Sequence, residues 1–279
     1  MTRRHLLCIG AHPDDNEINV GGLAALWRSL GHDVRFVSVT NGDRGHHELR
    51  YRDNPSSLAH RRHAEALAAA AVIGAEYRTL GVRDGEVQVE HAATEAMVRC
   101  IRSFGEPGVG PDLVVFNRTI DYHRDHRNAA QLVVDATYLL TVPTFCPDTP
   151  HLARMPVFAT WYDDFRDQGA FRTDVLLGID AQFEAKVDMV CSHVSQFFEW
   201  LPYNSGTLDT VPPDPAGRRD RVAAILDRRS RIRTAAGADA RVRISPGERS
   251  EAYQLCEYGR VPDDTEAEDL FAGCGSSGG

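Results

Sequence analysis

Short apolar runs alternate with helical segments through the first half of this chain, and that alternation constrains its fold more than any other feature. The runs at 5–10, 33–40 and 112–117 are rich in apolar and β-branched residues, which favours buried strands. Between the first two runs, residues 18–30 have a helical pattern that ends at Gly31. A strand, a helix and a second strand in this order indicate a right-handed crossover between parallel strands.

The remaining elements extend this pattern beyond the first crossover. The other predicted helices cover 58–73, 91–104, 127–140, 181–200 and 218–235, and the other predicted strands cover 76–80, 157–161 and 173–179. Residues 251–258 are predicted as a last strand or a helical turn. The polar segment 41–57 is predicted as a long functional loop. We therefore expect an α/β protein, a three-layer α/β/α sandwich with a mostly parallel, Rossmann-like sheet.

The length of 279 residues suits one large domain or two small ones, and we predict one. It covers residues 1–262, with a regular core over 1–140 and a less regular, substrate-facing part over 141–262. The segment 263–279 is acidic and then low in complexity, so we expect a flexible tail there.

Composition narrows the classes of partner. The net charge is −9, with 40 acidic against 31 basic residues, which argues against binding to nucleic acid. No stretch reaches the roughly 18–20 apolar residues that a membrane-spanning helix needs, and no secretory signal precedes the first strand. We therefore expect a cytoplasmic protein with a small-molecule substrate and no membrane or nucleic-acid partner. Whether it is a monomer or a homo-oligomer is left open.

Two polar segments carry the chemistry, and each follows directly on a predicted strand. The first is AHPDDNE, which begins at Ala11 after the first strand. The second is DYHRDH, which begins at Asp121 after the strand at 112–117. Because ligands of α/β folds bind outside the carboxyl ends of the strands, both segments lie where a site is expected.

Each segment also has a simpler interpretation. The carboxylates of the first would cap the N-terminus of a helix, and the histidines of the second would be solvated. A cap does not explain His-Pro followed by two acids, because adjacent like charges cost energy unless a cation offsets them. Together the segments supply two imidazoles and several carboxylates. This is the ligand set of a catalytic divalent ion, commonly zinc, with three protein ligands and one open position.

The AHPDDNE segment after a first strand, with HRDH after a later one, resembles the LmbE-like (PIG-L) family of zinc-dependent N-deacetylases. The resemblance covers the first 140 residues and extends through the segment from Lys186 to Gln196. It implies that the protein removes an acetyl group from N-acetylglucosamine-type substrates. It also implies that His12, Asp15 and His126 hold the metal, with Zn²⁺ as the first expectation and another divalent metal as the alternative.

The resemblance implies catalytic roles as well. Asp14 is expected to be the general base, His123 the protonated electrophile or general acid, and Asp125 the residue that orients His123. Physical chemistry supports Asp14, because neighbouring side chains diverge and leave it free to accept a proton while Asp15 binds the metal. A donor at His123 would stabilise a developing oxyanion by several kcal/mol.

Substrate contacts are expected from three other segments. The resemblance implies that Arg62 and Asp84 contact the sugar. His193 is predicted to reach the site from the late helix, with packing in the core as the alternative. In the long loop, His46 and His47 either line the mouth of the pocket or are solvated.

These observations predict a metal-dependent hydrolase that releases acetate and a free amine from the N-acetylated amino sugar of a small metabolite. Two alternatives stay open. One is an amidase that acts on a larger amide such as a thiol conjugate, and the other is a non-catalytic sugar-binding module. No GxGxxG follows the first strand, which argues against a dinucleotide-dependent dehydrogenase.

Overall fold

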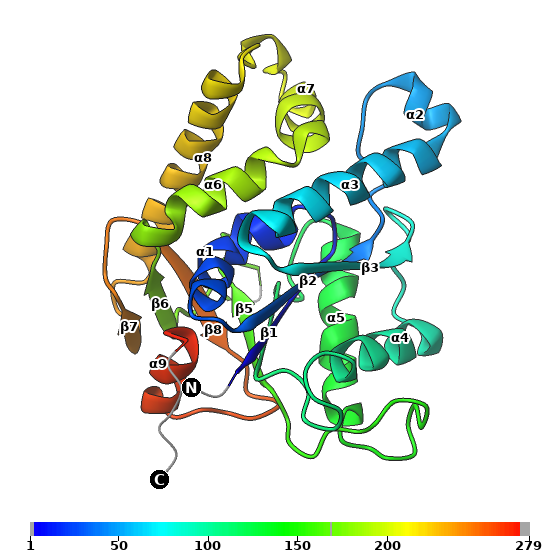
Figure 1. Cartoon of the computed structure of the whole chain (residues 1–279), viewed down its shortest axis with the longest axis vertical. Coiled ribbons are helices and arrows are strands. Elements are labelled where there is room, and N and C mark those ends of the chain that lie inside the picture. The colour runs from blue at the N-terminus through cyan, green and yellow to red at the C-terminus, as the bar shows by residue number, and fades with distance from the viewer. Residues whose placement is uncertain (1–2, 168, 274–279) are drawn as a thin grey trace.

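The computed structural model describes residues 3–167 and 169–273, which fold around one sheet with helices on both faces (Figure 1). In these residues the sheet has eight strands in the order β3-β2-β1-β4-β5-β8-β6-β7. The strands are β1 (His5–Gly10), β2 (Asp33–Thr40), β3 (Glu76–Val82), β4 (Leu113–Phe116), β5 (Val157–Trp161), β6 (Val175–Gly178), β7 (Val242–Ile244) and β8 (Ser250–Leu255). Strand β8 is antiparallel to both its neighbours and the other pairs are parallel, which confirms a mostly parallel sheet.

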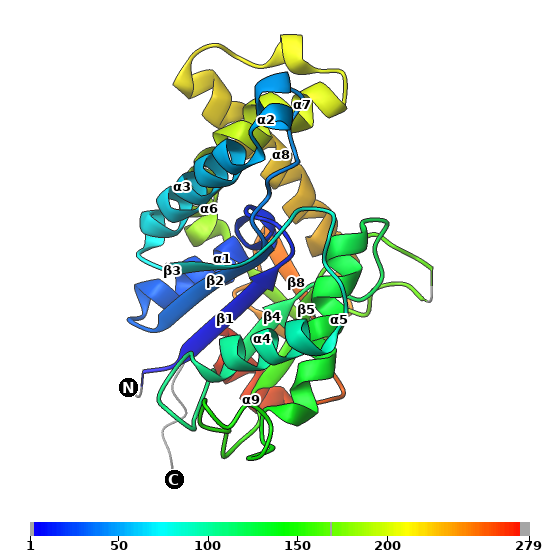
Figure 2. The same ribbon diagram turned by 90° about the vertical axis from the view of Figure 1, so that its right-hand side faces the viewer.

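The helices form two layers, one on each face of the sheet (Figure 2). One layer contains α1 (Asp15–Ser29), α3 (Pro55–Ile73), α6 (Phe183–Cys191) and α8 (Pro215–Ala236), and the other contains α4 (His91–Arg102) and α5 (Arg124–Leu139). The described residues also form α2 (Leu49–Asp53), α7 (Leu201–Asn204), α9 (Asp264–Phe271) and a π-helical segment, Ser195–Trp200. The predicted three-layer architecture is therefore confirmed.

Strand β1 lies inside the sheet and is buried on both faces. Leu6 and Cys8 belong to the apolar cluster beneath α1, whereas Leu7 and Ile9 belong to the cluster beneath α4 and α5. A strand covered on both faces needs apolar side chains at successive positions, which is why its sequence shows no polar alternation. Full burial of each such side chain contributes about 1.5–3 kcal/mol. The strand thus gives the loop that follows it a rigid base.

Two adjacent glycines let α1 pack closely against its neighbours. A Cβ on Gly22 would stand 2.5 Å from Cγ2 of Ile179. The backbone N–H groups of Gly22 and Leu23 donate to the carboxylate of Glu251 on β8, at 2.8 and 2.9 Å. Lys186 of α6 donates to the same buried carboxylate. Helix α1, whose first residue is the predicted ligand Asp15, is thereby linked to α6 and β8.

Several element boundaries differ from the predictions because tertiary contacts override the local pattern. The helix predicted at 181–200 is broken, since α6 ends at Cys191 and the π-helical segment follows it. The loop predicted at 41–57 contains α2 and the start of α3. Helix α5 begins at Arg124 rather than at 127, so His126 lies in its first turn.

The flexible tail predicted from residue 263 is wrong for its first part. Residues Asp264–Phe271 form α9, and Phe271 is fully buried in the apolar cluster that includes Trp27. The end of the predicted tail, 274–279, lies outside the described residues. Strand β7 has no predicted counterpart. Within the described ranges, no helix has the length and apolar character needed to cross a membrane.

Candidate metal centre

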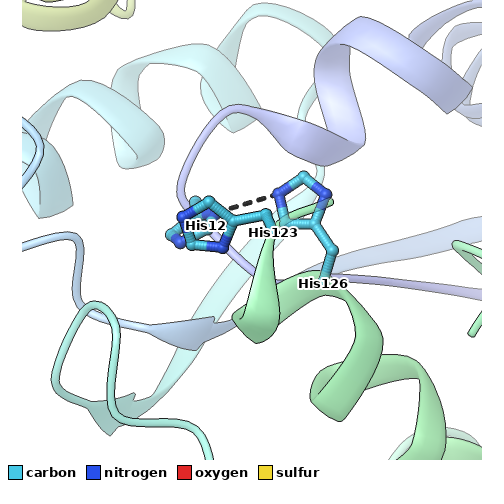
Figure 3. A group of neighbouring side chains, drawn as sticks. All are labelled: His12, His123 and His126. Carbon is cyan, nitrogen blue, oxygen red and sulfur yellow. Dashed lines mark hydrogen bonds between the residues drawn. The ribbon is translucent and has the colours of Figure 1, made fainter. Parts of the chain in front are cut away.

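Two loops bring the predicted site together at one edge of the sheet. Strands β1 and β4 are parallel neighbours, so the loops after their carboxyl ends lie side by side. His12 follows β1, and His123 and His126 stand at the start of α5, beyond β4 (Figure 3). A cavity of about 690 Å³ opens at this edge, and all three histidines line it.

Three donor atoms converge in this cavity. Nδ1 of His12 lies 3.1 Å from Nε2 of His126, and Oδ2 of Asp15 lies 3.8 Å from the former atom and 3.6 Å from the latter. Two ligand atoms that each lie about 2.05 Å from a tetrahedral ion are about 3.3 Å apart. The three donors implied by the resemblance therefore have the spacing of a tetrahedral site, and their nitrogen and oxygen atoms suit zinc.

The far nitrogen of each imidazole contacts a carboxylate. Nδ1 of His126 lies 2.9 Å from Asp121, and Nε2 of His12 lies 3.1 Å from Asp84 and 3.3 Å from Asp125. When the rings are neutral, the proton lies on the nitrogen that faces a carboxylate, which is Nδ1 in His126 and Nε2 in His12. The lone pairs of the other two nitrogens then face each other. Lone pairs and a carboxylate that converge in this way repel unless a cation lies between them. Carboxylates behind histidines are typical of metal sites, so the donor set fits a divalent cation.

The carboxylates behind His12 are ionised and anchored. Burial opposes a positive charge on His12, but its hydrogen bonds with Asp125 and Asp84 raise its pKa to about 10. Burial likewise opposes ionisation of Asp84, yet the hydrogen bond from His12 lowers the pKa of Asp84 to about 2. Asp125 also accepts the backbone N–H groups of Gly85 and Val87, at 2.5 and 3.1 Å. The two carboxylates thus hold His12 in one orientation.

The contacts of Asp125 correct its predicted role. Its carboxylate binds His12 and the 85–87 backbone, whereas its backbone N–H donates to Nδ1 of His123 at 3.2 Å. The side chain of Asp125 therefore orients His12, and the residue holds the ring of His123 through its backbone N–H rather than through the carboxylate. The reason is that the turn after β3 crosses the start of α5 and surrounds this carboxylate.

His123 lies beside the three donor atoms at the start of α5. It caps the N-terminus of α5 and its ring lies 4.8 Å from that of His12 between centroids. Burial and the charges of His12 and His126 lower the pKa of His123, and the protonated state expected of its ring in the reaction stays a prediction. Since Nδ1 accepts from the N–H of Asp125, the neutral ring carries its proton on Nε2. His123 can therefore donate a hydrogen bond without carrying a charge.

Asp14 stands beside the three donors in a rare backbone conformation. Its φ of 129° lies in a region that non-glycine residues seldom adopt. Its side chain makes no cap hydrogen bond, which argues against the helix-cap interpretation. Burial raises the pKa of Asp14 to about 6, although the guanidinium of Arg62 lies 3.6 Å from its carboxylate. A carboxyl group that titrates near neutral pH is suited to accept and return a proton.

Arg62 of α3 is buried beside Asp14 and lines the cavity. It donates to the carbonyl groups of Pro13 at 2.8 Å and Gly42 at 3.3 Å, and so joins the loops after β1 and β2. Gly42 has a φ of +66°, and a Cβ there would stand 2.5 Å from the guanidinium. Asp84, the other predicted sugar contact, also lines the cavity. Sugar contact by these two residues stays a prediction.

His193 is a predicted substrate contact that the structure does not bring to the cavity. It is fully buried, with Nε2 3.3 Å from Oε1 of Glu17 on α1, and it is absent from the lining residues. The prediction is therefore corrected to its alternative, packing in the core, because the chain turns after α6 and directs this ring toward α1. Gln196 of the same segment lines the cavity instead and donates to the carbonyl of Gly45 at 3.1 Å.

Other lining residues were not assigned from the sequence. In the predicted loop 41–57, Arg44 lines the cavity, whereas His46 pairs with Glu199 and His47 stacks on Tyr203. The unassigned side chains on the other walls include Asp121, Trp161, Asp164, Trp200, Arg229 and Arg233. Asp121 carried a sequence signal, since it opens the DYHRDH segment. The others stand on elements whose orientation a single sequence does not reveal.

Comparison with known proteins shows which family the first half of the chain matches. Residues 7–137 match the family model described as PIG-L, GlcNAc-PI de-N-acetylase. A diacetylchitobiose deacetylase from Thermococcus kodakarensis is 27% identical over 214 residues, which are 72% of this chain and 74% of that protein.

Solved structures share the fold at lower identity. An N,N'-diacetylchitobiose deacetylase from Pyrococcus horikoshii has a TM-score of 0.69 and 20% identity, over 91% of this chain and 84% of that chain. A 4-carboxy-2-hydroxymuconate hydratase from Pseudomonas putida has a TM-score of 0.67 and 18% identity, over 93% of this chain and 98% of that chain. At such identity the structures show the fold alone, whereas the family match covers both segments that build the site. Residues 7–137 of this chain are therefore a domain of the PIG-L family.

Proposed function

We propose that this protein is a metal-dependent hydrolase that removes the acetyl group from the N-acetylated amino sugar of a small metabolite. The convergence of Nδ1 of His12, Oδ2 of Asp15 and Nε2 of His126, with carboxylates behind both rings, is the observation that carries this proposal. The reaction class is supported by the PIG-L family match and by the similarity to a diacetylchitobiose deacetylase. The fold alone does not select it, because a hydratase has the same fold.

His12, Asp15 and His126 would hold the divalent ion, and zinc is the ion that this donor set favours. When bound, such an ion acidifies a water molecule and polarises the amide carbonyl. Their supporting carboxylates are anchored by backbone N–H groups, so the three ligands need little rearrangement. A site held in place in this way binds its ion without a large ordering cost.

Asp14 and His123 would carry the proton transfer and the charge. Asp14 accepts a proton as the water oxygen bonds to the carbonyl carbon, and its raised pKa lets it return that proton to the leaving nitrogen. The C–N bond then breaks, acetic acid and a free amine leave, and the acid loses its proton to water to give acetate. His123 donates its Nε2–H to the carbonyl oxygen as negative charge develops there. Arg62 keeps Asp14 in place through the carbonyl of Pro13.

The cavity suits a sugar with a further substituent. Its volume of about 690 Å³ lies in the range of small-molecule pockets. Trp161, Trp200 and Tyr122 line it, and aromatic faces of this kind pack against the apolar C–H faces of sugar rings. These walls come from the second half of the chain and from the loop before α5, so they lie beside the metal centre rather than within it.

Acetate release from zinc-restored protein tests the proposal. The full chain is treated with a chelator, reloaded with Zn²⁺ and incubated with N-acetylglucosamine, diacetylchitobiose, N-acetylglucosaminides and a bulky thiol-conjugated amide. Asp14→Asn is expected to lower kcat by at least about 100-fold, whereas Asp135→Asn, an exposed carboxylate on α5, keeps the wild-type rate. No acetate from any amino sugar, or full activity in Asp14→Asn, would overturn the proposal. Sugar binding without acetate release would indicate a binding module, and release from the bulky amide alone would indicate an amidase.

A further inference from the structure

Gln196 lines the cavity with its side-chain amide held in one orientation. The residue is 3% exposed and belongs to the π-helical segment Ser195–Trp200. Its Nε2 donates to the carbonyl of Gly45 at 3.1 Å and to Oγ of Ser195 at 3.3 Å. A carbonyl can only accept a hydrogen bond, so the NH₂ group, and not Oε1, faces Gly45. Both hydrogens of the NH₂ group are therefore used within the protein.

Ser195 fixes this orientation from behind. Its hydroxyl donates to Oε2 of Glu65 on α3 at 2.6 Å, and its backbone N–H donates to Oε1 of the same carboxylate at 3.0 Å. Because the hydroxyl hydrogen points at Glu65, Oγ offers only lone pairs to Gln196. A reversed amide would place its oxygen against two acceptors. The amide of Gln196 therefore keeps Oε1 free as an acceptor.

Two acceptor oxygens on this wall have no donor in the part of the chain that the structure describes. One is Oε1 of Gln196, and the other is Oδ2 of Asp84, whose Oδ1 contacts Nε2 of His12 at 3.1 Å. Asp84 is 8% exposed, so both side chains are more than nine-tenths buried, yet both oxygens stay accessible from the cavity. Acceptors on buried side chains are normally hydrogen-bonded, so these two call for a donor from a ligand.

Gly45 leaves room for such a ligand between the two oxygens. A Cβ on Gly45 would stand 3.6 Å from Oε1 of Gln196, 3.6 Å from Oδ2 of Asp84 and 3.2 Å from Nη1 of Arg62. The three polar atoms therefore surround one space of the size of a methyl group, and a hydroxyl group has a similar size. Nη1 carries two hydrogens and has one described acceptor, the carbonyl of Gly42. The space is thus bordered by two acceptors and a donor.

A neutral hydroxyl suits this space better than a charged group does. An anion would meet the carboxylate of Asp84, and a cation would meet the guanidinium of Arg62, whose Nη1 lies 3.8 Å from that carboxylate. A hydroxyl donates one hydrogen bond and accepts others, so it can serve the acceptors and the donor together.

We propose that Gln196 is a specificity-determining residue, whose Oε1 accepts a hydrogen bond from a hydroxyl of the amino sugar in the space beside Gly45. Asp84 joins this space to the metal centre, because its Oδ1 contacts the proposed ligand His12 and its Oδ2 borders the space. The sugar reaches the space when its acetamido group lies at the metal centre, so the contact rests on the proposed function. A sugar without that hydroxyl leaves a buried acceptor unpaired, and this cost makes a polar site selective.

Calorimetric titration of zinc-loaded Asp14→Asn protein, which prevents turnover, tests the contact. The probes are N-acetylglucosamine and its 3-deoxy, 4-deoxy and 6-deoxy analogues. We expect at least one analogue to bind about three- to tenfold more weakly than the parent sugar, as the loss of a neutral hydrogen bond predicts. Adding Gln196→Met abolishes this discrimination for one analogue and leaves the others unchanged. Adding Gln131→Met, on α5 outside the cavity lining, keeps all of it. If Gln196→Met weakens all four sugars by the same factor, or keeps every difference, the contact is overturned.

Gly45→Ala is a second variant, which decides the matter if Gln196→Met does not fold. Its methyl group takes the space of the hydroxyl and leaves the carbonyl that holds Gln196 in place. One deoxy analogue that the Asp14→Asn protein binds more weakly is then expected to bind at least as tightly as the parent sugar. An unchanged preference for the parent sugar over all three analogues would overturn the contact.

Acetate release by protein with Asp14 intact separates this contact from the proposed function. Discrimination that depends on Gln196, without acetate from any sugar, would overturn the deacetylase proposal and leave the contact standing. Acetate release with the same relative kcat/KM for all four sugars in the wild type and in Gln196→Met would overturn the contact and leave the deacetylase proposal standing.

Discussion

Replacing Asp121 by asparagine separates the charge behind His126 from the shape of the site. Oδ2 of Asp121 lies 2.9 Å from Nδ1 of His126, while Oδ1 accepts the backbone N–H of His123 at 2.7 Å. An asparagine has one oxygen, so it serves one of these two donors and presents its NH₂ group to the other. If the NH₂ group faces His126, the ring must carry its proton on Nε2, the nitrogen proposed to bind the metal.

The expected loss of affinity follows from these two orientations. Removing an outer carboxylate of a metal-binding histidine lowers metal affinity by about 10–100-fold. This corresponds to about 1.4–2.7 kcal/mol of binding free energy. The lower value applies if the asparagine keeps its oxygen on His126, because only the charge is lost. The upper value applies if the ring changes its tautomer.

Competition for zinc against a chromogenic chelator measures this affinity on the full chain. Asp135→Asn, which removes an exposed carboxylate from the same helix α5, is the matched control and keeps the wild-type affinity. Thermal unfolding of both metal-free variants checks that the fold is intact. If Asp121→Asn binds zinc within twofold of the wild type, the carboxylate does not control the ligand and the reasoning fails.

Two further predictions concern the rest of the fold. Lys186→Met leaves the fully buried Glu251 without its cation, and it is expected to lower the free energy of unfolding by about 3–5 kcal/mol in urea titrations; a loss below about 1 kcal/mol would contradict this. For Glu199, burial opposes ionisation, but hydrogen bonds from Arg61 and His46 lower its pKa below the usual 4.5. The stability that Glu199 adds is therefore present above about pH 4.5 and lost as the pH falls through its folded-state pKa. The difference in unfolding free energy between wild type and Glu199→Gln should shrink from about pH 6 to about pH 3, and a constant difference would show that the ion pair contributes nothing.

Elements with a strong local pattern could be predicted, and those decided by tertiary contacts could not. Strand β1 is buried on both faces, so its run of apolar residues was sufficient evidence. Helix α9 carries an apolar set, Ala267, Leu270 and Phe271, at helical spacing, but the acidic composition around it favoured a tail. The break after Cys191 left no signal, because the apolar pattern continues across it.

The candidate site likewise has features that could be predicted from the sequence and features that could not. The ligands could be proposed because two motifs follow neighbouring parallel strands, and such loops meet at one edge. The partner of Asp125 could not be inferred, because it depends on the turn at Gly85, which approaches α5 only in three dimensions. Arg229 and Arg233 were likewise indistinguishable among the many arginines until the helix had an orientation.

The hydrogen bonds between Glu251 and helix α1 bear on the order of events during protein synthesis. Gly22 and Glu251 are 229 residues apart in sequence. At about 5–20 residues per second, the ribosome needs roughly 10–45 s to make that interval. Helix α1, with Asp15 in its first turn, therefore completes its packing only after strand β8 has been synthesised. Asp15, a proposed ligand, therefore reaches its final packing only after nearly the whole chain has been translated, well after the two motifs emerge.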